Sequence, residues 1–130
     1  TKAFFAETIS NPQIDVLDIP GVSGVAHAHG IPLIVDNTIA TPYLIQPIAH
    51  GADIVVHSAT KYLNGHSDVV AGALVTAVDD PYWQRLRAWR RAQGAVLGPF
   101  EAWLATHRYR VARRFDNVFA VNYCIEPVDG

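Results

Sequence analysis

One short stretch of the chain, residues 57–68 (HSATKYLNGHSD), combines a rare amine with hydroxyl groups. Lys61 is one of only two lysines in the sequence, and Ser58 and Thr60 come shortly before it. The apolar residues 54–56 lead into this stretch, so Lys61 is predicted to lie in a turn just past the end of a buried strand, where open α/β sheets bind their ligands. A lysine beside hydroxyls in such a turn indicates a covalent or a phosphate-linked role.

A carboxylate is expected close to this lysine. Asp36 ends the apolar run 32–36 (PLIVD), and if this run and residues 53–56 form parallel strands, their carboxyl ends meet at one edge of the sheet. A pyridoxal phosphate site requires such a set: the amine forms an imine with the aldehyde, the carboxylate keeps the pyridine nitrogen protonated, and hydroxyls hold the phosphate. The alternatives are a solvated surface lysine, a turn-capping Asp36, and hydroxyls of Ser58 and Thr60 that bond only to the backbone.

Apolar runs and turn signals predict the elements that position these residues. In chain order we expect a strand at 3–7, a helix from Asp18 to Gly30, a strand at 32–36, a helical turn at 45–50, a strand at 53–56 and a strand at 69–78. The segment 37–43 (NTIATPY) is rich in turn-forming and β-branched residues and is predicted not to be helical. Strand, helix, strand, short helix, strand is typical of a parallel sheet, so the predicted class is α/β, with the strand order open.

Two helices are expected after the last strand. Asp79-Asp80-Pro81 opens the first of them, Gly94 ends it, and Pro99 opens the second. On the first, four apolar residues recur every three positions and are expected to share one face, in the core or at an interface: Trp83, Leu86, Trp89 and Ala92. Beyond about Thr106 the pattern is ambiguous, and residues 118–124 (VFAVNYC) fit either a strand or the end of the helix.

Composition narrows the class of protein and its partners. Half of the 130 residues are hydrophobic, which suffices for one core, and the net charge is −2. All eight arginines lie between Arg85 and Arg114 without a nucleic-acid-binding motif, so they are interpreted as the solvated face of helices. Polar residues, glycine or proline interrupt every apolar run well before ~20 residues, so no membrane span is expected. The single cysteine, Cys124, fits a reducing compartment, and we expect a cytoplasmic location.

The histidines do not predict a metal site. His27 and His29 lie two positions apart on the expected helix and therefore on different faces, and no HxxxH or cysteine-rich spacing occurs. The histidines at positions 27, 29, 50, 57 and 66 are interpreted mostly as helix-end or surface residues.

Four segments carry a family resemblance: FAETISNP, VDNTIATPYL, PIAHGADIVVHSATKYLNGHSDVVAGALV and GAVLGPFEAWL. Together they resemble the Cys/Met-metabolism (transsulfuration) family of pyridoxal phosphate enzymes, closest to O-acetylhomoserine sulfhydrylase and cystathionine γ-synthase. The resemblance implies the large three-layer α/β cofactor domain of aspartate-aminotransferase-like (fold type I) enzymes, of which residues 1–105 form the central part. Residues 106–130 depart from the family pattern and are left unassigned.

The resemblance also implies roles for single residues. The lysine of the family's SATKY motif carries the Schiff base to pyridoxal phosphate, which implies Lys61 as the catalytic residue. The acid of VDNT pairs with the pyridine nitrogen, which implies Asp36. The serine and threonine of SATK bind the phosphate, which implies Ser58 and Thr60. The asparagine of the SNP turn lies near the ring hydroxyl in relatives, which implies Asn11.

The activity that the resemblance implies is a γ-replacement or γ-elimination on an O-acylhomoserine such as O-acetylhomoserine, with sulfide or cysteine as second reactant. One alternative is elimination of the cystathionine γ-lyase or methionine γ-lyase type. Another is a non-catalytic, truncated remnant that binds cofactor weakly or not at all. Family members are longer homo-oligomers that share their sites between subunits, so this chain is expected to be a fragment. The expected partner is a small amino acid substrate, and neither nucleic acid nor a membrane.

Overall fold

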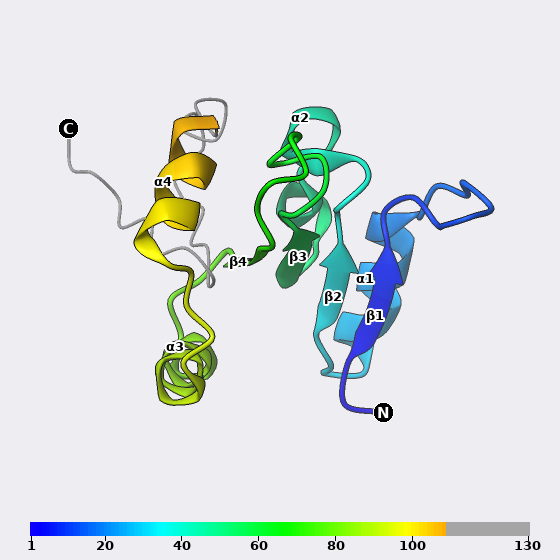
Figure 1. The fold of residues 1–130 in the computed structure, drawn as a ribbon. Coiled ribbons are helices and arrows are strands. Elements are labelled where there is room, and N and C mark those ends of the chain that lie inside the picture. The colour runs from blue at the N-terminus through cyan, green and yellow to red at the C-terminus, as the bar shows by residue number, and fades with distance from the viewer. Residues whose placement is uncertain (109–130) are drawn as a thin grey trace.

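The computed structural model describes residues 1–108 and shows one four-stranded mixed sheet with helices (Figure 1). The strands lie in the order of the chain: β1 (Phe4–Glu7), β2 (Leu33–Asp36), β3 (Ile54–Ser58) and β4 (Gly72–Thr76). The first three are parallel to one another, and β4 is antiparallel to β3. The predicted α/β class and the parallel arrangement of the first three strands are confirmed.

Helix α1 (Ile19–Ala28) connects β1 to β2 and covers one face of the sheet (Figure 1). Its start follows the predicted signal, because the Asp18 carboxylate accepts a hydrogen bond from the Gly21 N–H at 3.1 Å. Its end lies before Gly30, which has a φ of +65°. The main core forms between this helix and the sheet, from Ile19, Ala26, Leu33, Val35, Ala52, Val55 and Val75.

Two short helical elements lie between β2 and β3. The first, α2 (Thr41–Leu44), corrects the prediction that residues 37–43 contain no helix. Proline is tolerated in the first turn of a helix, so Pro42 does not prevent a single turn closed by the Ile45 N–H on the Thr41 carbonyl. The second, η1 (Pro47–His50), is the predicted helical turn that ends at Gly51.

Strands β3 and β4 are joined without a crossover helix. Residues 59–71 instead form a turn-rich segment that reverses the chain, which is why β4 returns antiparallel to β3. β3 extends two residues beyond its predicted end and includes Ser58, whereas β4 is shorter than the predicted run 69–78. This 59–71 segment contains Lys61, which therefore lies just past the end of a strand, as predicted.

Helix α3 (Pro81–Gln93) begins where predicted, with the Asp80 carboxylate accepting the Trp83 N–H at 2.8 Å. The prediction that its apolar residues share one face is wrong. Trp83 is 2% exposed, Trp89 is 67% exposed and Ala92 is also exposed. At about 100° per residue, a spacing of three turns ~60° short of a full circle, so the series rotates steadily away from the buried side.

Helix α4 (Pro99–Arg108) packs on the segment that contains Lys61. Its buried Ala105 joins Ala59, Val69 and Ala71 in a second apolar cluster. No helix described in residues 1–108 is long and apolar enough to cross a membrane. The unassigned run 118–124 lies outside the described residues, and the domain boundary at Ala105 stays a prediction.

Candidate functional site

The carboxyl ends of the parallel strands bring Asp36 and Ser58 to one edge of the sheet. Asp36 pairs with Val56 in the β2–β3 register, and Ser58 follows two residues later, so both side chains belong to the same face. Thr38 connects them: its N–H donates to Asp36 Oδ1 at 2.8 Å, and its hydroxyl accepts the Ser58 N–H at 2.7 Å. The predicted meeting of the Asp36 carboxylate with the end of β3 is confirmed.

The turn after β3 presents Lys61 to solvent at this edge. The Lys61 N–H donates to the Ser58 carbonyl at 3.2 Å, and the Gly65 N–H donates to the Lys61 carbonyl at 2.7 Å. Gly65 has a φ of +72°, a conformation that glycine adopts without a steric cost. Within residues 1–108 the Lys61 amine forms no ion pair or hydrogen bond, so it is available to a ligand.

The two hydroxyls of this segment differ in their contacts. The Thr60 hydroxyl donates to the Ala71 carbonyl at 3.1 Å and accepts the Ala71 N–H at 2.8 Å, which closes the base of the turn. The Ser58 hydroxyl forms no hydrogen bond with any described residue, and Ser58 is half-buried. Ser58 is therefore the freer of the two donors.

Asn11 is not brought together with the other predicted site residues. It lies in the exposed loop after β1, where its N–H donates to the Glu7 carboxylate at 3.1 Å. Figure 1 shows this loop extending away from the sheet beyond β1, while the turn with Lys61 follows β3. The structure therefore does not bring Asn11 to the Lys61 turn.

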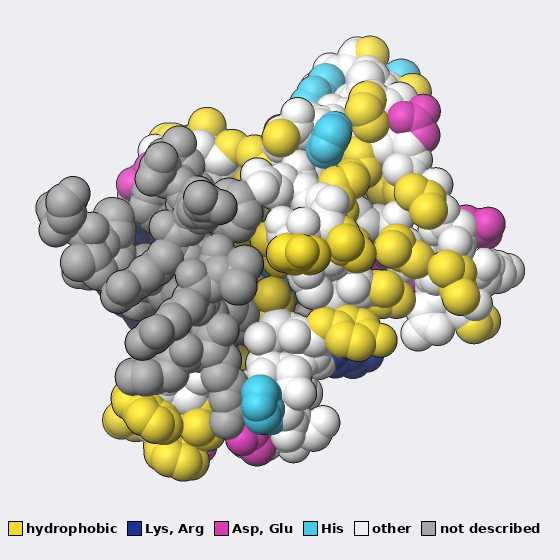
Figure 2. All heavy atoms as spheres, turned by 90° about the horizontal axis from the view of Figure 1, so that it is seen from above, with side chains coloured by type: hydrophobic (Ala, Val, Ile, Leu, Met, Phe, Trp, Pro, Cys, Tyr) yellow, Lys and Arg dark blue, Asp and Glu magenta, His cyan; other side chains and the backbone are white. Residues whose placement is uncertain are grey.

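Exposed hydrophobic side chains occur on α2 and on the 59–71 segment that contains Lys61. Seen from the carboxyl edge in Figure 2, hydrophobic side chains are spread over this face with few charged ones among them. Four large hydrophobic residues of α2 and the 59–71 segment are at least 66% exposed: Tyr43 and Leu44 on α2, and Tyr62 and Val70 on the 59–71 segment. No group of three histidine, cysteine or acidic side chains that could hold a metal ion occurs in the described part of the chain.

His57 is a feature of this edge that the sequence did not reveal. The interpretation of the histidines as helix-end or surface residues is wrong for His57, which lies within β3 and is 3% exposed. Burial lowers its pKa, against smaller raising effects of the Asp36 charge and the Asn37 backbone. Its Nδ1 has no hydrogen-bond partner among the described residues. Burial therefore favours the neutral form of His57, which directly follows Val56, the partner of Asp36 in the strand register.

The burial of His57 should make the free energy of unfolding depend on pH. The folded-state pKa of His57 lies below its ordinary value of 6.5, so the unfolded chain binds the proton first as the pH falls. The free energy of unfolding then decreases below about pH 6.5, by at most ~1.4 kcal/mol per pH unit for one proton. Urea unfolding between pH 7 and about pH 5 is expected to show a smaller decrease for His57→Gln. If the free energy of unfolding decreases equally in the unsubstituted chain and in His57→Gln, the pH dependence does not come from His57.

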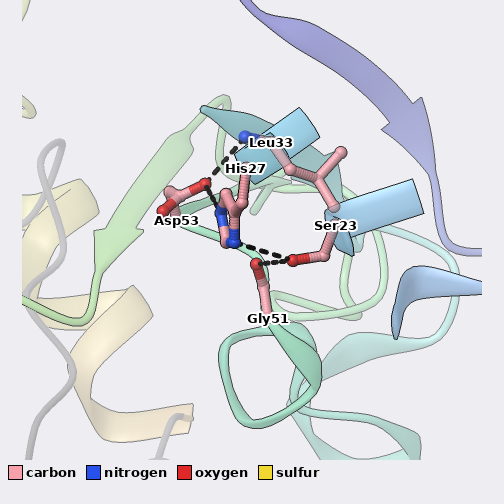
Figure 3. Close-up of polar contacts among 5 residues, drawn as sticks. All are labelled: Ser23, His27, Leu33, Gly51 and Asp53. Atoms are coloured by element: carbon pink, nitrogen blue, oxygen red, sulfur yellow. Dashed lines mark hydrogen bonds and ion pairs between the residues drawn. The ribbon is translucent and has the colours of Figure 1, made fainter. Parts of the chain in front are cut away.

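A second polar cluster lies at the opposite edge, where β2 and β3 begin (Figure 3). Asp53 pairs at this edge: its Oδ2 accepts the Leu33 N–H at 2.8 Å and lies 2.9 Å from His27 Nε2. Ser23 on α1 donates its hydroxyl to the Gly51 carbonyl at 2.7 Å. Gly51 has a φ of +103°, and a Cβ there would lie 2.5 Å from Ser23 Oγ, so the close approach requires glycine.

Serine, histidine and aspartate are the members of a nucleophilic triad, but this cluster does not have the geometry of one. In such a triad the histidine Nε2 faces the serine and Nδ1 faces the carboxylate. Here Nδ1 of His27 lies 3.3 Å from Ser23 Oγ, and Nε2 faces Asp53. The Ser23 proton is already donated to a backbone carbonyl, and Ser23 is buried. The cluster therefore holds α1 against the sheet.

Asp53→Ala is expected to lower the free energy of unfolding by about 1–3 kcal/mol, because it leaves the Leu33 N–H without its acceptor. The lower end applies, since the Asp53 side chain is 40% exposed. His27→Ala is the matched control: it removes the exposed contact of His27 Nε2 with Asp53 Oδ2 but keeps the Leu33 bond, and should cost less than about 1 kcal/mol. Urea unfolding measures both, and equal losses would show that the backbone contact does not matter.

The sequence and fold match those of characterised enzymes. The chain is 58% identical over 104 residues to cystathionine beta-lyase of Lactococcus lactis subsp. cremoris (strain MG1363), covering 80% of this chain and 27% of that protein. It is 49% identical over 104 residues to cystathionine gamma-synthase/O-acetylhomoserine (thiol)-lyase of Bacillus subtilis (strain 168), covering 80% and 28%. The chain thus spans less than a third of the length of these relatives.

The crystal structure of apo CalE6, a methionine gamma lyase from Micromonospora echinospora, has the same fold. The two superpose with a TM-score of 0.79 at 40% identity, over 82% of this chain and 29% of the other. The described residues therefore form a part of the fold type I cofactor domain, as the resemblance implied. The family described as Cys/Met metabolism PLP-dependent enzyme matches residues 1–124. The chain belongs to this family of pyridoxal phosphate-dependent enzymes.

Proposed function

We propose that this chain holds pyridoxal phosphate covalently through Lys61 and forms part of the site of a transsulfuration enzyme. The observation that carries the proposal is the position of the Lys61 amine: exposed, without an ion pair in residues 1–108, and in the turn directly after β3. The strand register adds Asp36 and Ser58 at the same edge and on one face.

The residues present fit the cofactor. An aldehyde requires an accessible amine, which Lys61 supplies. The ring nitrogen requires a carboxylate, and Asp36 has one oxygen committed to the Thr38 N–H, which leaves the other for a ligand. The phosphate requires donors, and the Ser58 hydroxyl is unused among the described residues. The donor set thus contains one group for each polar part of pyridoxal phosphate.

Thr60 belongs to the same proposal through a change of hydrogen bond. Its proton now points to the Ala71 carbonyl, which also accepts the Thr60 N–H at 3.0 Å. If the hydroxyl turns to a phosphate oxygen, that carbonyl keeps a donor, and the Ala71 N–H keeps its acceptor on Thr60. Thr60 can therefore bind the phosphate without an unpaired group in the turn. Asn11 is kept as a weaker candidate near the ring hydroxyl.

Each residue has a definite task in this proposal. When bound, pyridoxal phosphate supplies a ring that takes up the electron pair of a bond broken at the amino acid α-carbon. Lys61 Nζ would hold the cofactor and, as a free amine, would accept the α-proton of the substrate and return protons later in the reaction. Asp36 holds a proton at the ring nitrogen through its negative charge. Ser58 and Thr60 orient the phosphate and thereby the ring.

For the complete protein we propose γ-replacement on an O-acylhomoserine such as O-acetylhomoserine, with sulfide or cysteine as the second reactant. The 49% identity to a cystathionine gamma-synthase/O-acetylhomoserine (thiol)-lyase supports it. The second candidate is cleavage of cystathionine, which the 58% identity to a cystathionine beta-lyase favours. The proposal includes a homo-oligomer with sites shared between subunits, and a cytoplasmic location that rests on the single Cys124.

Parallel assays of the complete protein that contains this chain distinguish the two candidates. Pyridoxal phosphate is added, and O-acetylhomoserine with sulfide or cysteine is compared with cystathionine alone. Consumption of O-acetylhomoserine supports the first candidate. Cleavage of cystathionine, with no consumption of O-acetylhomoserine in the parallel assay, supports the second. The 130-residue chain alone is expected to bind the cofactor without turnover, since it spans only 27–28% of these relatives. Lys61-dependent turnover by the chain alone would contradict that expectation.

A further inference from the structure

Three buried polar side chains lie in a row across the carboxyl ends of β1, β2 and β3. They are Thr8, Asn37 and His57, each at most 3% exposed. Glu7 pairs with Asp36, and Asp36 pairs with Val56, so the next residue on each chain segment lies at the same level of the sheet. Thr8 and Asn37 directly follow β1 and β2, whereas His57 lies within β3. The row belongs to the face that packs against α1, opposite to the face of Asp36 and Ser58.

Asn37 is the centre of this row and contacts three separate parts of the chain. Its side-chain oxygen accepts the Thr8 hydroxyl at 2.8 Å, beyond β1, and its side-chain nitrogen donates to the Ile45 carbonyl at 3.0 Å, after α2. Its backbone N–H donates to the Val56 carbonyl at 2.9 Å, on β3. Asn37 is 0% exposed and its bond with Thr8 is buried, so this bond is shielded from water, whereas the bond with the Ile45 carbonyl is partly buried.

These contacts determine the direction of the neighbouring Asp36. Consecutive side chains point to opposite faces, so a fixed Asn37 side chain directs Asp36 to the other face. The Thr8 hydroxyl also lies 3.0 Å from the Asp36 carbonyl oxygen, and the Thr8 N–H donates to that oxygen at 2.9 Å. The carbonyl of Asp36 and the side chain of the next residue are therefore both held by hydrogen bonds with Thr8.

We propose that Asn37 is a positioning residue, which holds the Asp36 carboxylate in the direction needed to meet the ring nitrogen of pyridoxal phosphate. This inference rests on the proposed function. A primary amide suits the position because it accepts on one side, from a hydroxyl, and donates on the other, to a carbonyl. An aspartate in its place would put a second acceptor against the Ile45 carbonyl, and an aliphatic residue would remove the side-chain donor to that carbonyl.

Two variants test the role of Asn37 on the 130-residue chain. Asn37→Ala removes both side-chain bonds of Asn37, and Thr8→Val removes the contacts of the Thr8 hydroxyl with Asn37 Oδ1 and the Asp36 carbonyl, with little change of shape. We expect the dissociation constant of pyridoxal phosphate to rise by about tenfold or more for Asn37→Ala and by less for Thr8→Val. A loss of about this size follows mutation of residues that orient the metal-binding side chains of metalloproteins. The circular dichroism that the protein induces in the cofactor's visible band should fall in parallel, since it reports a fixed ring orientation.

Ser23→Ala is the matched control, because it also removes a buried hydroxyl bond, from the opposite edge of the sheet. It should lower the free energy of unfolding but leave the cofactor affinity and the induced circular dichroism unchanged. If both row variants behave like Ser23→Ala, Asn37 is only structural and the inference is overturned. Thr8→Val provides this test even if Asn37→Ala does not fold. Absence of a Lys61-dependent band in the unsubstituted chain instead overturns the proposed function, and this inference with it.

Discussion

Lys61→Ala is expected to abolish the visible absorbance band that develops when the chain is mixed with pyridoxal phosphate. The band requires a covalent bond between the aldehyde and an amine, and the other side-chain amine, Lys2, lies at the opposite end of the sheet from the Lys61 turn. The cofactor should also be lost from Lys61→Ala on gel filtration, because only non-covalent contacts remain. This is the largest effect that we expect from any single substitution.

Lys2→Ala is the matched control, since it removes the same type of side chain before β1. Lys2→Ala should retain the band at the intensity of the unsubstituted chain. Loss of the band in Lys2→Ala with retention in Lys61→Ala would place the covalent bond at the wrong end of the molecule and refute the site.

Asp36→Ala is expected to weaken pyridoxal phosphate binding by about 30-fold or more, since removal of one partner from a desolvated charge pair costs ~2–5 kcal/mol. The same substitution removes the acceptor of the Thr38 N–H, which neighbours the Ser58 contact. The dissociation constant is measured by titration of the visible band. Asp36→Asn keeps the shape but not the charge, and should show most of the same loss.

The control for Asp36 is an acidic residue remote from the Lys61 turn. Asp15→Ala changes an exposed carboxylate in the loop after β1 and should leave the dissociation constant within about twofold. Asp36→Asn with unchanged affinity would show that the charge of this residue does not contact the ring. The role of Asp36 would then be limited to its bond with Thr38.

The sequence predicted the parts of the fold that depend on local signals. Asp18 and Asp80 each cap the helix they were expected to open, because capping needs only neighbours along the chain. The meeting of Asp36 with the turn of Lys61 also followed from the sequence, since apolar runs separated by a helix imply parallel strands with shared carboxyl ends. Recognition of SATKY and VDNT then supplied the chemistry.

The remainder depends on contacts between distant residues. Thr8 and Asn37 are 29 positions apart, and no local pattern marks their hydrogen bond. Burial of His57 depends on the packing of β3 in the sheet, whereas its sequence neighbours are polar on one side. Trp89 was expected from spacing alone to share one face with Trp83, in the core or at an interface, but rotation around the helix axis separates them. The asparagine that follows Asp36 in the VDNT motif was the one signal in the sequence for the row that supports Asp36.

Covalent trapping tests the central claim most directly. The chain is mixed with pyridoxal phosphate, reduced with borohydride to make the attachment permanent, digested and mapped by mass spectrometry. The amines available are Lys61, Lys2 and the amino group of Thr1, so the peptides separate the possibilities. We predict that the cofactor mass is found on the peptide that contains Lys61. Label on Lys2 or Thr1 alone, or no label at all, would contradict the assignment of Lys61 as the residue that holds the cofactor.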